Sequence, residues 1–132
     1  MSFAGVGDDY PVRQEIRDMY KAKGQEPPKA MSDTVMYNRG ILWAALHVEA
    51  THNALKLNGG KQPTGEDVKK GFEQIKDFSL GGLVPPLQVT AADHQGGGWV
   101  QVFQVKGGKF VKETEWFRAY PEVVAETVRK AE

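Results

Sequence analysis

The sequence contains no cysteine among its 132 residues, and this absence excludes several kinds of site. Thiol nucleophiles, zinc sites built on cysteine and structural disulfides all require that side chain. An excess of charge of either sign is missing as well, because 17 basic side chains balance 17 acidic ones. Nucleic acids and anionic membranes attract proteins mainly through a basic excess. We therefore expect no nucleic-acid partner.

Long apolar runs are also absent from the sequence. No stretch approaches the roughly 18 apolar residues of a membrane-spanning helix, and no signal peptide opens the chain. The sequence as it stands predicts either a protein that stays inside the cell or a piece of a longer one. Its composition, with 40% hydrophobic and 26% charged residues, is that of a folded domain. This length is typical of one domain with its own core.

Apolar residues recur at helical spacing in four segments, while residues 1–8 favour a short strand or an incoming linker. The expected helices cover residues 11–24, 34–57, 64–75 and 121–131. Ser32 or Asp33 is expected to cap the second helix, and Thr64 with Asp67 resembles a capping box for the third.

The second expected helix is apolar over more than half of its circumference. Such a helix is usually central and packed on two sides. Gly40 lies inside it, where glycine costs about 1 kcal/mol relative to alanine. We expect that another backbone approaches closely at Gly40.

The remainder of the sequence is not helical. In residues 77–95 the helical period disappears, and paired glycines and prolines indicate an extended segment that travels some distance. Residues 99–105 and 109–114 are rich in aromatic and β-branched side chains and flank Gly107-Gly108, which predicts a hairpin. The expected fold class is α+β, with four helices and a C-terminal β-hairpin.

The polar side chains do not form a catalytic pattern. His47 and His52 are five residues apart, about 140° around a helix, whereas a zinc-binding helix needs a spacing of four. Glu49 and His52 have the spacing of half a di-iron site, but such a site needs a second pair and further glutamates. Solvent-facing or locally hydrogen-bonded histidines are the favoured interpretation. We expect no catalytic residue, no metal and no cofactor.

Five aromatic side chains near the C-terminus allow two interpretations. They could stack on nucleic-acid bases, or they could form a half-buried sheet face. No basic stripe accompanies them, so the sheet face is favoured. The five are Trp99, Phe103, Trp116, Phe117 and Tyr120.

An ordered set of motifs covers nearly the whole chain. Residues 37–40 are Tyr-Asn-Arg-Gly, residues 64–68 are Thr-Gly-Glu-Asp-Val, and Gly81-Gly82, Pro85-Pro86 and His94 precede the hairpin. Together they resemble the C-terminal third of bacterial periplasmic solute-binding proteins of the leucine/isoleucine/valine type. That resemblance implies part of a two-lobe α/β fold of the type I periplasmic binding proteins.

The resemblance also implies an assignment of segments. Residues 1–76 would carry helices of the first lobe, residues 77–96 a crossing between the lobes, and residues 97–132 the terminal hairpin and helix of the second lobe. The loop at residues 31–37 would lie at the ligand cleft, with Tyr37 as the candidate ligand contact. Packing of the helix start is the alternative role for Tyr37.

The function implied by the resemblance is transport. The parent protein would bind an amino acid or an aromatic or organic acid in the periplasm and deliver it to an ABC permease. Two alternatives remain: an independent binding or sensory module, and a remnant without ligand binding. The hypothesis of an enzyme would be based only on Glu49 and His52. We further expect the isolated chain to self-associate, because its apolar helix would lack the strands that normally cover it.

Overall fold

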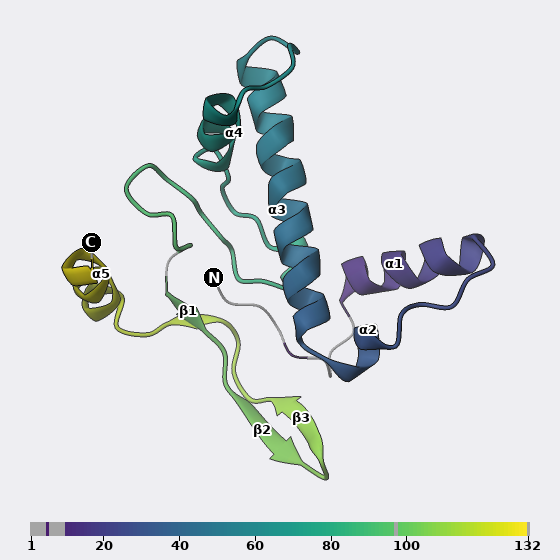
Figure 1. The fold of residues 1–132 in the computed structure, drawn as a ribbon. Coiled ribbons are helices and arrows are strands. Elements are labelled where there is room, and N and C mark those ends of the chain that lie inside the picture. Colours follow the sequence, from purple (N-terminus) through teal and green to yellow (C-terminus); the bar gives the residue numbers. More distant parts are fainter. Residues whose placement is uncertain (1–4, 6–9, 97, 132) are drawn as a thin grey trace.

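The computed structural model describes residues 5, 10–96 and 98–131, so most of the segment predicted as a strand or linker lies outside the described residues. Figure 1 shows the long helix α3 in the middle, with α4 beside one end of it and α1 and α2 near the other. The hairpin β2–β3 and the helix α5 extend away from α3. The elements are α1 (Pro11–Ala22), α2 (Ala30–Asp33), α3 (Met36–Leu57), α4 (Gly65–Phe72), the 3-10 turn η1 (Leu80–Gly82), β1 (Trp99–Val100), β2 (Phe103–Lys106), β3 (Lys109–Lys112), β4 (Phe117–Arg118) and α5 (Pro121–Ala131).

The four predicted helices are confirmed, and local sequence signals explain most of their ends. Helix α1 starts at a proline and ends before Gly24, which adopts a φ of 65°. Helix α4 has the predicted capping box: Thr64 accepts from the Asp67 amide, and the Asp67 carboxylate accepts from the Thr64 amide at 2.9 Å. Helix α4 ends at Phe72, three residues before the predicted end at Ile75, because the chain turns there and Ile75 enters the core.

The start of α3 differs from the prediction. Ser32 and Asp33 do not cap it, because they belong to the separate short helix α2. Thr34 supplies the polar group instead: its hydroxyl accepts a hydrogen bond from the Met36 amide at 3.2 Å. Asp and Ser are among the residue types that favour helix caps. A capping residue must also have an extended backbone just before the helix, and Thr34 meets this condition with a φ of −146°.

The predicted hairpin is confirmed. Strand β2 pairs antiparallel with β3 so that Lys106 lies opposite Lys109, and both turn glycines have positive φ, as a tight hairpin turn requires. The sequence did not indicate that the ribbon continues in a second pair, β1 with β4. Two extra residues separate the pairs on the returning strand, and there the Thr114 hydroxyl accepts from the Val102 amide at 3.0 Å.

Helices α3 and α4 meet almost backbone to backbone. A Cβ atom added to Gly71 of α4 would lie 2.0 Å from the carbonyl oxygen of Ala50 on α3. Across this contact Asn53 donates its side-chain amide to the Gly71 carbonyl at 3.3 Å. The predicted close approach at Gly40 is wrong within the described chain, because no heavy atom lies within 4 Å of a Cβ built there.

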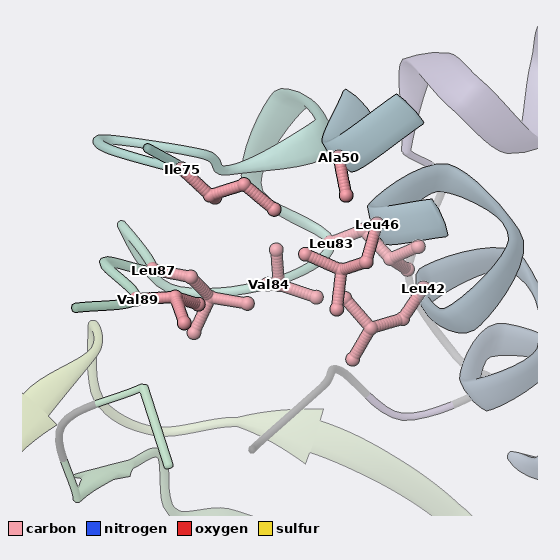
Figure 2. Close-up of a cluster of buried hydrophobic side chains, with 8 residues drawn as sticks. All are labelled: Leu42, Leu46, Ala50, Ile75, Leu83, Val84, Leu87 and Val89. Carbon is pink, nitrogen blue, oxygen red and sulfur yellow. The ribbon is translucent and has the colours of Figure 1, made fainter. Parts of the chain in front are cut away.

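The core lies between one face of α3 and the segment that follows α4. Figure 2 shows the side chains from α3 and from this segment directed toward one another. Each large aliphatic side chain removed from water there contributes about 1.5–3 kcal/mol. The eight members are Leu42, Leu46, Ala50, Ile75, Leu83, Val84, Leu87 and Val89.

Residues 77–95 do not travel away as an extended segment. Phe78 and Leu87 exchange two backbone hydrogen bonds, of 3.1 and 3.0 Å, and so close a loop around η1. The prediction failed because glycine and proline pairs mark turns without showing whether the chain leaves or folds back. Folding back brings the aliphatic residues of this segment onto α3.

Among the described residues, helix α3 is buried along one side only, which corrects the expected two-sided packing. Its buried residues recur every four positions from Asn38 to Ala54. Met36, Trp43, Val48 and Leu57 are exposed. The reason is that α4 and the segment at residues 75–89 approach the same side of the helix.

The Gly71 contact gives a matched pair of substitutions. Gly71→Ala is expected to destabilise the protein by about 3 kcal/mol, because its methyl group would collide with backbone atoms that cannot swing aside. Gly40→Ala, on the open side of α3, is expected to stabilise it by about 1 kcal/mol. Urea unfolding measures both, and equal stability of the Gly71→Ala variant and the parent would contradict the close packing.

Candidate functional site

Tyr37 lies on the first turn of α3, where α1, α2 and α3 meet. Its side chain is half-buried, and its hydroxyl is hydrogen-bonded to Tyr20 of α1. Burial, and then the neighbouring Tyr20, raise the pKa of Tyr37 above its ordinary value of 10.0. The phenol is therefore protonated at neutral pH and can donate or accept one further hydrogen bond.

Two buried polar side chains hold this junction together. Arg13 of α1 is only 2% exposed, and its guanidinium donates to the carbonyl oxygen of Met31 in α2 at 2.6 Å. Asn38, next to Tyr37, is fully buried and donates to the carbonyl of Gly5 at 3.1 Å. A buried charge is tolerated only when it is hydrogen-bonded, so Arg13 fixes α1 against α2. Only the tertiary structure shows that Arg13 is buried.

The histidines on α3 have local roles. The His47 ring nitrogen Nδ1 lies 2.8 Å from the Trp43 carbonyl oxygen, and the ring meets Phe72 edge-on at 5.3 Å. His52 is exposed. These positions agree with the favoured interpretation of solvent-facing or locally hydrogen-bonded side chains. Across the described residues, no three His, Asp or Glu side chains gather closely enough to hold a metal ion.

The C-terminal aromatic residues do not share one environment. Trp99, Phe103 and Trp116 are half-buried, whereas Phe117 and Tyr120 are exposed. Trp116 donates its indole N–H to the Gly82 carbonyl at 3.4 Å and packs against the core, so it ties the β ribbon to η1. Three of the five side chains are therefore half-buried as predicted, but only Trp99 and Phe103 of these three lie in strands, since Trp116 stands between β3 and β4.

A hollow beside α4 was not anticipated from the sequence. Val68 and Phe72 of α4 line it together with the core residue Val89, and His94 belongs to the lining as well. His94 Nε2 lies 3.4 Å from Glu73 Oε1, and the Glu73 side chain is 18% exposed. The sequence marked His94 only as part of a glycine- and proline-containing motif. Its contact with Glu73, 21 residues earlier, depends on the folding back of residues 77–95.

None of the helices in the described part of the chain is both long enough and apolar enough to cross a membrane.

Comparison with known proteins gives a structural relationship. No protein-family model matches the sequence, and no curated protein matches it. The structure is similar to that of an ABC transporter permease from the Pseudomonas fluorescens group, with a TM-score of 0.74 and 26% identity over 98% of this chain and 35% of that one. It is also similar to a branched-chain amino acid ABC transporter from Thermus thermophilus with bound valine, with a TM-score of 0.72 and 25% identity over 98% of this chain and 34% of that one.

The chain thus spans about a third of the length of these two solved chains. The fold-class prediction is confirmed: the protein is a mixed α+β chain that matches part of a larger fold of the periplasmic-binding-protein type.

The raised pKa of Tyr37 predicts a pH dependence of stability. Because the folded protein holds the phenolic proton more tightly than the unfolded chain, the contribution is fully present below pH 10 and is lost as the pH rises through the folded pKa. Tyr37→Phe should therefore lose less stability than the parent as the pH rises above 10. The control is Tyr120→Phe, since Tyr120 is 74% exposed. Thermal unfolding across this range measures the difference, and identical pH profiles for all three proteins would contradict the assignment.

Proposed function

We propose that this chain is the C-terminal part of the solute-binding component of an ABC transporter. The supporting observation is the likeness of 98% of the chain to two ABC transporter structures, one of which contains valine. The complete component would bind a small amino acid or an aromatic or organic acid and deliver it to a permease. In bacteria with a periplasm, that is the compartment in which it would act. The proposal includes no catalytic step.

The segment assignment belongs to the same proposal. Residues 1–76 would be helices of the first lobe, residues 77–96 would contain a crossing between lobes, and residues 97–132 would be the hairpin and helix of the second lobe. The one-sided cover of α3 is in keeping with this, because a helix of a larger α/β layer needs a sheet on its remaining apolar side. In such a protein the ligand is held by groups from both lobes, and its binding closes them.

Tyr37 is the residue of this chain that we propose as a ligand contact. It stands at the end of α3 that carries the junction with α1 and α2, and its phenol keeps its proton at neutral pH. A protonated phenol can donate to a carboxylate and accept from an ammonium group, the two charged groups of an amino acid.

A ligand titration tests the proposal. Valine, leucine and benzoate are added to the protein in a thermal-shift and calorimetric series, because a ligand that binds the folded state raises its apparent stability. We expect one class to give a saturable increase, and Tyr37→Phe to weaken its affinity by about two- to tenfold, the value of one hydrogen bond. Tyr120→Phe should leave the affinity unchanged. If no member of the series stabilises the protein, ligand binding by this chain is contradicted.

We also propose that the chain self-associates through the exposed face of α3. Met36, Gly40 and Trp43 lie on this face, where Trp43 is 52% exposed although the Arg39 guanidinium sits 4.3 Å from its ring centroid. Gly40 leaves a gap between Met36 and Trp43, into which a second copy could pack at short range.

The oligomeric state tests this association. Trp43→Ser should shift the protein toward monomer in sedimentation analysis, because the large apolar anchor is lost. Val48→Ser is the control: Val48 is equally apolar and 70% exposed but is rotated about 140° around α3 from Trp43. A parent protein that stays monomeric at high micromolar concentration would refute the association.

A further inference from the structure

The loop between α3 and α4 begins with Asn58-Gly59-Gly60 and lies at the end of α3 opposite to α1 and α2 (Figure 1). An asparagine that precedes glycine is prone to lose its side-chain amide, because glycine has no side chain to shield its backbone nitrogen. We propose that Asn58 is a site of spontaneous deamidation, at which it becomes aspartate or isoaspartate and thereby loosens the junction of α3 with α4.

The reaction consumes only water. The backbone nitrogen of Gly59, after giving its proton to a base in the solvent, attacks Cγ of Asn58 and forms a new C–N bond. The bond between Cγ and Nδ2 then breaks, and ammonia leaves with a proton taken from water, so that a succinimide ring remains. A second water molecule opens this ring at either of its carbonyl carbons. Opening at Cγ gives aspartate, whereas opening at the main-chain carbonyl gives isoaspartate, whose backbone runs through the former side chain.

The backbone of the loop leaves the attacking nitrogen accessible. Gly59 is exposed, and among the described residues no carbonyl accepts a hydrogen bond from its N–H. The amides of Asn58 and Gly60 do donate to carbonyls of α3, at 3.0 and 2.8 Å. Asn58 has a ψ of 12°, so ring closure requires the peptide between Asn58 and Gly59 to rotate. Gly59 permits this rotation, because no heavy atom lies within 4 Å of a Cβ built on it.

The other two asparagines of the sequence are held differently. Asn38 is fully buried inside α3, and Asn53 lies inside the same helix and donates its side-chain amide to the carbonyl of Gly71 at 3.3 Å. Each precedes a residue that has a side chain and whose amide belongs to the helical hydrogen-bond ladder. Asn38 and Asn53 are therefore internal references for the reactivity of Asn58.

A carboxylate at position 58 would disturb the start of α4. The pKa of Asp67 is lowered mainly by its hydrogen bonds with Thr64, and the side-chain amide of Asn58 contributes as a further hydrogen-bond partner. Deamidation would replace that amide with a second carboxylate, so two negative charges would face each other. The new charge would also stand at the C-terminal end of α3, where the helix dipole disfavours an anion. Both effects weaken the cap that positions α4 for its contact at Gly71.

The test is peptide mapping by mass spectrometry of the purified full chain, incubated at mildly alkaline pH. A synthetic peptide covering residues 55–62 is incubated in parallel until it has been converted. We expect the mass gain of an amide-to-acid exchange at Asn58, with aspartate and isoaspartate separated by chromatography, and no change at Asn38 or Asn53. Asn58→Gln is the matched control, because glutamine would have to close a larger ring and should keep its amide.

The effect on the junction is tested by a double-mutant cycle. Asn58→Asp, which carries the charge of the aspartate product, should lower the urea midpoint of unfolding. Combined with Asp67→Asn, it should cost less than the sum of the two separate effects, since one amide again faces one carboxylate.

Three results would overturn the proposal. An unchanged Asn58 after complete conversion of the peptide would exclude the site, and equal conversion at Asn53 would remove the role of the loop. Additive effects of the substitutions at positions 58 and 67 would exclude the link to α4. None of these results bears on the transport proposal, which concerns Tyr37 at the other end of α3.

Discussion

The contact between Gly71 and the backbone of α3 is the constraint on which the arrangement of this protein depends. It lets α4 approach to within a distance that no side chain would allow, since even a methyl group would lie 2.0 Å from the Ala50 carbonyl oxygen. The end of α4 then directs Ile75 into the core, and Ile75 in turn accepts the backbone bond from Val89. Both the aliphatic core and the hollow beside α4 follow from the way in which these two helices meet.

The core is one-sided, and this bears on what the chain can do. Half of its members come from residues 83–89, which fold back onto α3 after the Phe78–Leu87 pairing. All of this packing uses one face of α3, so the opposite face keeps Met36 and Trp43 in contact with solvent. A binding component with two lobes would use such a face against a sheet.

Tyr37 and the hollow beside α4 lie in different surroundings. Tyr37 belongs to a junction held by a buried arginine, and its phenol is kept protonated by burial and by Tyr20. The surface of the hollow beside α4 is almost wholly apolar, and the imidazole of His94 next to it faces the Glu73 carboxylate. In the proposed transport component, the remainder of the larger protein would add further ligand contacts to those of Tyr37. The hollow has both of its walls within the described residues.

The sequence by itself determined the local elements. Proline and glycine at the ends of α1, the reciprocal cap at Thr64 and the Gly107-Gly108 turn act through the backbone of a few neighbouring residues, so their effects could be predicted without the rest of the fold. Much of α3 and the fold class followed from periodicity. Neither the burial of Arg13 nor the pairing of β1 with β4 nor the contact of Glu73 with His94 was predicted. Only the tertiary structure decided those features, and only it showed that the close backbone contact is at Gly71 and not at Gly40. Each of them depends on which segment, distant in the sequence, packs against a given residue, and local sequence patterns do not contain that information.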